Sequence, residues 1–243
     1  MNKKQLNKES VLKVYYDNVI YSLNEEEKTA IVIGCKAGIT KIKIPKSIKY
    51  KSQIYDIIII SEHSFWRSTI KSIEFSNDSQ IHTIEKEAFY WSSIESISIP
   101  SEVSLIGESA FYGCNKLRQV KFPNDSKLRT IEKQVFNKSS IESIQIPKKV
   151  TKIKDHAFCA CDKLKKVEIP TDSELQMIGK YAFSETLIEN ISIPSKVAVI
   201  GENAFTYCNK IRTIEIPNDS NLQIIEQELI SSSSIECFTI PSN

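Results

Sequence analysis

Side chains able to carry acid–base or nucleophilic chemistry are few and scattered in this sequence. The three histidines are His63, His82 and His156, and none forms a recognisable nucleophile motif with a serine or a cysteine. Neither a glycine-rich phosphate loop nor an HExxH motif is present. We therefore predict no catalytic residues, no cofactor and a protein that is not an enzyme.

One short segment has the composition of a metal site. His156, Cys159 and Cys161 fall within six residues and could supply three zinc ligands. Cys161, however, recurs as Cys114 and Cys208 at intervals of 47 residues, each time three residues after a phenylalanine. A small thiol at a repeated position next to a core aromatic residue is more typical of packing than of metal binding. The prediction is that no metal is bound.

A polar turn also recurs every 47 residues. Its aspartates are Asp78, Asp125, Asp172 and Asp219. Calcium binding is one interpretation, but Asx turns, in which Asn or Asp side chains close their own turns, are favoured. Glycosylation sequons begin at Asn77, Asn124, Asn137, Asn190 and Asn218. They would accept glycans only if the chain entered a secretory lumen.

The elements that must position these residues come from an internal repeat. A 22-residue unit, IEKEAFYWSSIESISIPSEVSL from Ile84, alternates with a 25-residue unit, IGESAFYGCNKLRQVKFPNDSKLRT from Ile106. Each is followed by two further copies, so that the pair forms a superperiod of 47 residues. This pattern predicts a solenoid in which each unit is one coil.

Each unit contains an apolar triplet such as Ile97 to Ile99, whose alternation predicts a short strand buried on one face. All eight prolines follow such triplets directly. Proline donates no ladder hydrogen bond, so it suits the point at which a strand leaves the sheet. The segment IGESAF should then make one helical or 3₁₀ turn on the back face, and its phenylalanines should stack through the core. The predicted stack is Phe65, Phe89, Phe111, Phe136, Phe158, Phe183 and Phe205.

The predicted class is an α/β, β-rich solenoid with a parallel sheet on one face. Residues 1–58 are expected to form an N-terminal β-hairpin cap, continuous as one domain with a solenoid of seven to eight coils over residues 59–243. Repeated cysteines two coils apart lie about 9.5 Å from each other, beyond the roughly 7 Å limit for bridged Cα atoms, and should be reduced. Ile235, Phe238 and Ile240 would leave the last coil uncapped. Three interpretations follow: the chain is a fragment, the last coil frays, or its edge pairs with a second copy in an end-to-end homodimer.

The pattern I-G-x-x-A-F-x-x-C-x-x-L-x-x-[IV]-x-[IF]-P resembles the BspA-like leucine-rich repeats of surface antigens in mucosal bacteria and protozoan parasites. Segment GITKIKIPKSIKYKSQIYDIIIISEHSF resembles the entry hairpin that precedes those repeats. This resemblance implies a right-handed leucine-rich-repeat superhelix. It also implies adhesion to proteins of the host extracellular matrix, of host cells or of microbial surfaces.

The sequence is compatible with two locations. No secretory signal peptide is recognisable, so a surface location would require non-classical export, whereas the alternative is an intracellular scaffold or regulatory subunit. Thirty-two Lys and Arg residues against 30 Asp and Glu give a net charge of +2, which does not favour nucleic acid as a partner. The longest aliphatic run is too short to insert in a membrane.

The sheet face carries two polar columns. Two residues before each triplet, charges alternate in sign from coil to coil, which predicts a ladder of ion pairs that holds register, with recognition as the less favoured alternative. These residues are Lys71, Glu95, Arg118, Glu142, Lys165, Glu189, Arg212 and Glu236. The column at the centre of the triplets is the better candidate for protein binding. Its proposed contact residues are Glu74, Lys121, Gln145, Glu168 and Glu215.

A second candidate is aromatic. Trp66, Tyr90 and Tyr112 follow the core phenylalanine in three successive coils, and Trp91 adjoins them. Exposed Trp and Tyr side chains are frequent binding hot spots. Two interpretations remain open: these rings form a binding patch, or they pack beneath the N-terminal cap.

Overall fold

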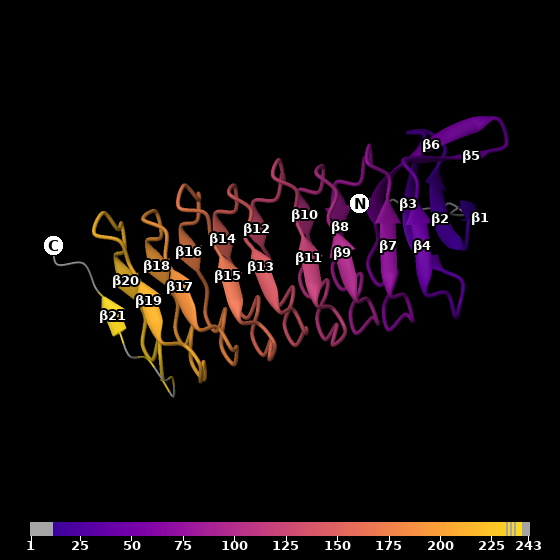
Figure 1. Cartoon of the computed structure of the whole chain (residues 1–243). Coiled ribbons are helices and arrows are strands. Elements are labelled where there is room, and N and C mark those ends of the chain that lie inside the picture. The colour runs from indigo at the N-terminus through magenta and orange to yellow at the C-terminus, as the bar shows by residue number, and fades with distance from the viewer. Residues whose placement is uncertain (1–11, 232, 234, 236, 240–243) are drawn as a thin grey trace, which may run out of the picture.

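The computed structural model describes residues 12–231, 233, 235 and 237–239, and within them the chain forms a β-solenoid of 21 strands (Figure 1). Each coil runs from a front strand through the proline turn to a two-residue back strand, and then through the phenylalanine segment to the next coil. The predicted solenoid with a parallel sheet is confirmed. The described residues contain no helix, so the α component of the predicted class is wrong.

Front strands lie side by side along the whole solenoid and pair in parallel (Figure 1). Six of them form one sheet: β4 (Lys41–Ile44), β7 (Ser72–Phe75), β9 (Ser96–Ser98), β11 (Gln119–Lys121), β13 (Ser143–Gln145) and β15 (Lys166–Glu168). Three more form a second sheet: β17 (Asn190–Ser192), β19 (Thr213–Glu215) and β21 (Cys237–Thr239).

Back strands are shorter and also parallel. Five of them form one sheet: β12 (Thr130–Ile131), β14 (Lys152–Ile153), β16 (Met177–Ile178), β18 (Val199–Ile200) and β20 (Ile224–Ile225). The first two, β8 (Thr83–Ile84) and β10 (Leu105–Ile106), instead extend a sheet that comes from the N-terminal end. The coil therefore has hydrogen-bonded strands on two faces rather than on one.

Antiparallel strands cover the N-terminal end. Strands β1 (Leu12–Tyr16), β2 (Val19–Asn24) and β3 (Thr29–Cys35) form a meander, and β3 pairs in parallel with β6 (Gln53–Ile60), which pairs in turn with β8. Strand β5 (Ser47–Tyr50) forms a hairpin with β6 that projects from this end (Figure 1). Buried Val19, Tyr21, Ala30 and Val32 join the same core as the coils, so the edge of the first coil is covered.

The proline turns between Pro100 and Pro217 close in the same way. Each of these six proline carbonyls accepts a hydrogen bond from the amide three residues later, as Pro100 does from Val103 and Pro123 from Ser126. In the longer units a serine then accepts the amide two residues on: Ser79, Ser126, Ser173 and Ser220. The expectation of Asx turns is wrong for these contacts, because the serine hydroxyl accepts the amide two residues on, whereas Asp78 and Asp172 accept from the amides of their own residues.

The phenylalanine segment does not form the predicted helical or 3₁₀ turn. Glu87 and Trp91, which flank Ala88 and Phe89, have positive φ of 55° each, and equivalent residues recur in the other coils. These left-handed residues interrupt the helical path. Amides of Glu87, Phe89 and Trp91 point instead to carbonyls of the next coil, at 3.1, 2.8 and 2.8 Å. The amides between them, such as that of Tyr90, bond to the carbonyl three residues before. The segment therefore combines tight turns with hydrogen bonds to the neighbouring coil, which a regular helix could not make.

The phenylalanine column is confirmed. Successive rings from Phe65 to Phe205 stack with centroids 4.8–5.5 Å apart and interplanar angles of 1–24°. All seven side chains are at most 1% exposed. Each ring is held between the rings of the coils before and after it, so the column couples coils that are distant in sequence.

The repeated cysteines satisfy backbone groups in this core. The thiols of Cys114, Cys161 and Cys208 donate to the carbonyls of Phe89, Phe136 and Phe183, at 3.0, 3.0 and 3.1 Å. Burial raises the pKa of Cys114 and of Cys161 to about 12, so both are neutral thiols at physiological pH. The five described cysteines are all free, and among them the three repeated ones match the expectation of reduced thiols.

We predict that Phe111→Ala lowers the free energy of unfolding by about 3–5 kcal/mol, because it leaves a cavity between two stacked rings. Urea denaturation followed by circular dichroism measures the loss. Trp66→Ala, a truncation of an exposed ring, is the matched control and should change stability by less than about 1 kcal/mol. A loss below about 1 kcal/mol for Phe111→Ala would contradict a continuous core column.

The buried thiols should also be unreactive. In a variant whose Cys35, Cys159 and Cys237 are replaced by serine, the three remaining thiols should not react with DTNB at pH 8 in the folded state. All three should react in urea, because the thiolate is the nucleophile and burial suppresses both ionisation and access. Rapid labelling of the folded variant would show that these side chains are not held in the core.

Candidate functional site

The residues with potential for chemistry lie apart from one another. His63 bonds to Glu87 at 2.9 Å, His82 bonds to Thr83, and His156 stacks on Tyr181 with ring centroids 4.9 Å apart. Burial lowers the pKa of His156 below its usual value. Cys161 is turned into the core, away from any shared site with His156, and over the described residues no three ligating side chains are close enough to hold a metal ion.

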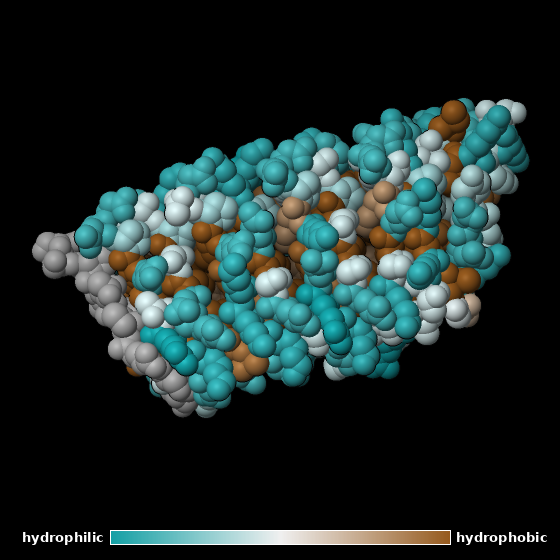
Figure 2. Space-filling view, in the orientation of Figure 1, coloured by the Kyte–Doolittle hydropathy of each residue, from teal (hydrophilic) through white to brown (hydrophobic). Residues whose placement is uncertain are grey.

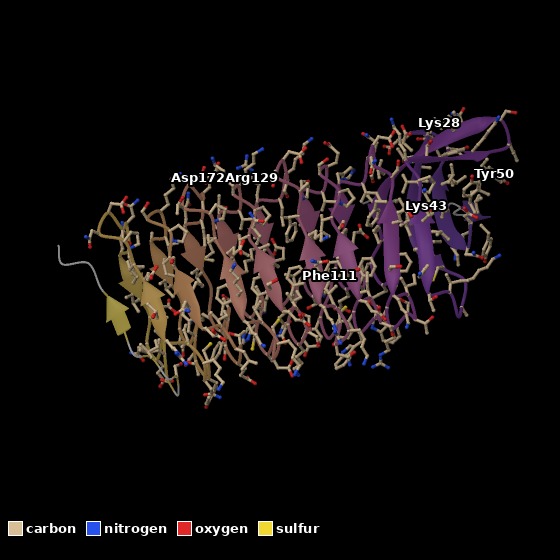
Figure 3. All side chains as sticks on the ribbon, in the orientation of Figure 1. Lys28, Lys43, Tyr50, Phe111, Arg129 and Asp172 are labelled. Carbon is tan, nitrogen blue, oxygen red and sulfur yellow. The ribbon has the colours of Figure 1, made fainter. Side chains whose placement is uncertain are left out.

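Two of the four aspartates of the recurrent polar turn, Asp78 and Asp172, contact lysines of the preceding coil. Asp78 lies 3.6 Å from Lys46 and also bonds to Ser76, and Asp172 pairs with Lys148. These contacts lower the pKa of both aspartates. Arg129 and Asp172 lie at the edge of the solenoid that carries these turns (Figure 3). The carboxylates thus have cationic partners within the protein.

Among the five sequons, Asn137 differs from the rest. Its side chain is buried, so the folded chain does not offer it to a modifying enzyme. The others are exposed: Asn77, Asn124, Asn190 and Asn218.

The front sheet presents a continuous exposed surface. Every described member of the central column is exposed, including Glu74, Lys121, Gln145, Glu168 and Glu215. In Figure 2 polar side chains stand in groups above an apolar floor, along the face on which the front strands lie. The last member of this column, Thr239, belongs to a strand whose side chains lie outside the described part of the structure.

Several charges of the central column have partners within the face. Glu74 pairs with Lys43 of β4 at 3.0 Å, and Glu168 pairs with Lys166 at 2.5 Å. The Ser192 hydroxyl donates to the carboxylate of Glu215 at 2.6 Å. All of these side chains are exposed, so the contacts orient the carboxylates without removing them from solvent.

Sequence reasoning missed a second outward column. Residues two positions before the central column also face outward, because side chains alternate along a strand. Its exposed members are Ser96, Gln119, Ser143, Lys166 and Asn190. These residues lie two positions before the central column in the sequence. Their side chains differ in chemistry from coil to coil, so they form no repeated motif.

The predicted ion-pair ladder is present in part. Lys71 lies 3.3 Å from Glu95, and Arg118 lies 3.9 Å from Glu142. Each pair joins two adjacent coils, as a register-holding role requires. Glu236, the last member of the predicted ladder, lies outside the described residues.

The predicted aromatic residues form a patch that the cap does not bury. Trp66 is 47% exposed and Trp91 is 41% exposed. Tyr90 stacks on Tyr112 with ring centroids 5.0 Å apart, and Trp91 meets Tyr112 edge-on. Gly113 makes this arrangement possible, because a Cβ there would come within 2.6 Å of the Trp91 ring.

Hollows interrupt the front face at regular intervals. One of about 500 Å³ lies around β9, one of about 360 Å³ around β13, and two of about 420 and 500 Å³ around β17. All are open depressions on the polar face rather than enclosed cavities. Their shape suits side chains of a partner more than a small substrate.

A family model described as BspA type leucine rich repeat region matches residues 33–141 and 129–243, with six copies of the repeat. No curated protein sequence matches the chain significantly.

Among solved structures, a leucine rich cell surface protein from Faecalibacterium prausnitzii A2-165 is 26% identical, with a TM-score of 0.70. The match covers 87% of this chain and 55% of that protein, so the chain spans about half of its length. The pneumococcal vaccine antigen PcpA is 20% identical, with a TM-score of 0.58 over 86% of this chain and 71% of PcpA. The leucine rich repeat protein TpLRR of T. pallidum is 18% identical, with a TM-score of 0.51 over 87% and 83%. The latter two likenesses are of fold alone.

We predict that Arg118→Glu lowers the free energy of unfolding by about 0.5–2 kcal/mol, because a carboxylate would then stand between Glu95 and Glu142. Raising the salt concentration to 1 M should recover much of this loss, since exposed charges are screened. Lys152→Glu makes the same charge change on back strand β14 and should cost less. Equal losses for both variants would show that the ladder does not hold register.

Proposed function

The chain belongs to the BspA-type leucine-rich repeat family, and from this premise we propose that it is a protein-binding solenoid that acts at a cell surface. In this proposal the front sheet contacts the partner, and the chain carries out no catalysis. The partners are proteins of the host extracellular matrix, of host cells or of other microbes.

The observation that carries the proposal is the architecture of the front sheet. Parallel strands from adjacent coils bring exposed polar side chains from across the solenoid into columns on one surface. The scaffold beneath is fixed by stacked phenylalanines and by hydrogen bonds between coils. A rigid surface loses little conformational entropy on binding, which favours its use in recognition.

The proposed location is supported by the F. prausnitzii protein, which is a cell surface protein. The described residues include no helix long and apolar enough to cross a bilayer. In this proposal, contact of the chain with the membrane is not needed, because the solenoid itself is the binding module.

The aromatic patch is proposed as a secondary contact. Arg67 lies over the ring of Trp66 and Lys138 over that of Tyr112, at 4.8 and 5.8 Å from the ring centroids. Aromatic rings and positive charges therefore lie together at the surface, and this combination is frequent in interface hot spots. The patch lies at the phenylalanine segments rather than on the front strands.

We predict that Glu168→Lys combined with Glu215→Lys weakens binding of the labelled protein to intact target cells at least tenfold. Both carboxylates are exposed on the front sheet, so reversal of their charge should oppose a partner that contacts them. Flow cytometry over a concentration series measures the affinity. The control variant, Glu185→Lys with Glu228→Lys, makes the same charge change away from the front strands. Unchanged affinity of the front-face variant, with saturable binding by the wild type, would remove this face as the contact surface.

Location is tested on cells that produce the protein. Protease treatment of intact cells should remove the chain while a cytosolic control protein survives, as detected with antibodies to both. Full protection of the chain would contradict action at the surface and would favour an intracellular scaffold or regulatory subunit.

A further inference from the structure

The front face is corrugated with a period of two coils. Strands of the longer units carry the long charged side chains Glu74, Lys121, Glu168 and Glu215 at their centres. Strands of the shorter units carry at least one serine at their two outward positions: Ser96 and Ser98, Ser143, and Ser192. Ridges and depressions therefore alternate along the solenoid.

Backbone pairing follows the same period in this region. Strands β9 and β11 pair over three residues, as do β13 with β15 and β17 with β19. At the intervening junctions β7 and β9 share one register pair, β11 and β13 also share one, and β15 and β17 lie in different sheets. The hollows around β9, β13 and β17 lie at these looser junctions.

The spacing of the hollows selects the conformation of an extended partner. Strands about 4.8 Å apart place hollows of alternate coils roughly 9.6 Å apart along the solenoid axis. The hollows around β13 and β17 lie over the strands, and the hollow around β9 is displaced toward the proline turns. A polyproline II chain rises about 3.1 Å per residue, so every third side chain recurs at about 9.3 Å on one side. The side chains on one side of a β-strand recur at roughly 6.7 Å, so a bound β-strand would not place a side chain at the second hollow. In an α-helix a side chain returns to nearly the same side after seven residues, which span about 10.5 Å. The difference from the spacing of the hollows adds up to about 1.8 Å over two periods.

The walls of the hollows select the side chains. Around β17, one hollow has Ile193, Pro194 and Ile216 as apolar walls, and Glu215 and Asp219 at its rim. The hollow around β9 has Glu74 and Asp125 at its rim. An apolar wall with a carboxylate at the rim fits the aliphatic stem and cationic end of lysine or arginine.

Cations also border two of these hollows. Lys121 lies with Glu168 at the hollow around β13. Lys165 and Lys166 lie with three glutamates at the strand side of the hollow around β17. Lys166 is paired with Glu168, so the carboxylates remain in excess at this hollow.

We propose that the front face binds an extended protein segment in the polyproline II conformation, with lysine or arginine at every third residue. Basic side chains enter the hollows around β9 and β17, where carboxylates outnumber lysines among the lining residues. The side chain between them meets Lys121 and Glu168 at the hollow around β13, and the remaining residues cross the ridges. This inference rests on the proposed function and names the chemistry of the partner. A segment already extended in solution gives up less conformational entropy when it binds.

Synthetic peptides test the spacing directly. The probe is fluorescent (Pro-Pro-Lys)₅, titrated against the full chain in fluorescence anisotropy. It should bind at least tenfold more tightly than a peptide of the same composition with lysines at irregular intervals, and (Pro-Pro-Glu)₅ should not bind. Equal affinity for the regular and irregular peptides would overturn the proposal, because charge alone would then explain binding.

Protein variants locate the site. Ser98→Tyr with Ser192→Tyr fills two hollows without changing any charge and should weaken (Pro-Pro-Lys)₅ binding at least tenfold. The control pair, Ser104→Tyr with Gln176→Tyr, adds the same bulk at exposed positions beside the back strands and should bind as the wild type does. Circular dichroism confirms that both variants are folded, and equal binding by both would overturn the assignment to the hollows.

Outcomes for the two proposals remain distinct. If Glu168→Lys with Glu215→Lys weakens binding to cells while (Pro-Pro-Lys)₅ does not bind, the front face is a contact surface for a partner of another conformation. If the peptide binds at the hollows while protease treatment leaves the chain intact in its source cells, the partner class stands and surface action fails.

Discussion

Everything in this molecule depends on the requirement that each coil bury its apolar face against its two neighbours. A single coil of 22 or 25 residues is too small to enclose a core, so its phenylalanine must stack on the rings before and after it. Stacking of the phenylalanines then aligns all the remaining residues of each coil with the equivalent residues of the neighbouring coils. The exposed columns of the front sheet are therefore a consequence of the buried phenylalanine column.

The alternation of two unit lengths adds a second level of order. The longer unit supplies the thiol that bonds to a backbone carbonyl of the shorter one, as Cys161 does to Phe136. It also supplies the long charged residue at the centre of its strand, whereas the shorter unit supplies serine or, at Gln145, glutamine. The two unit types therefore differ both in the core and on the outer surface.

Much of this could be predicted from the sequence because the repeat reports the same environment many times. Phe65, Phe111 and Cys114 were placed correctly, since seven phenylalanines or three cysteines at equivalent positions leave little room for another interpretation. The helical turn was wrong because the left-handed conformation of Glu87 has no sequence signal such as glycine. The serine-closed turns were missed although they are local, because the Asn and Asp side chains of the same turn offered another acceptor. The hollows were missed because they are lined by side chains of several coils, which local motifs do not encode.

Recognition on the front face is the central claim of this account. The most direct test places a photoreactive benzoylphenylalanine at Gln145, on the front sheet, and separately at Lys152, on the back strand β14. Each variant is bound to target cells and irradiated, and crosslinked peptides are identified by mass spectrometry. The account predicts crosslinks to a protein partner from the front position and few or none from the back position. Equal crosslinking from both positions, or crosslinking from the back alone, would contradict it.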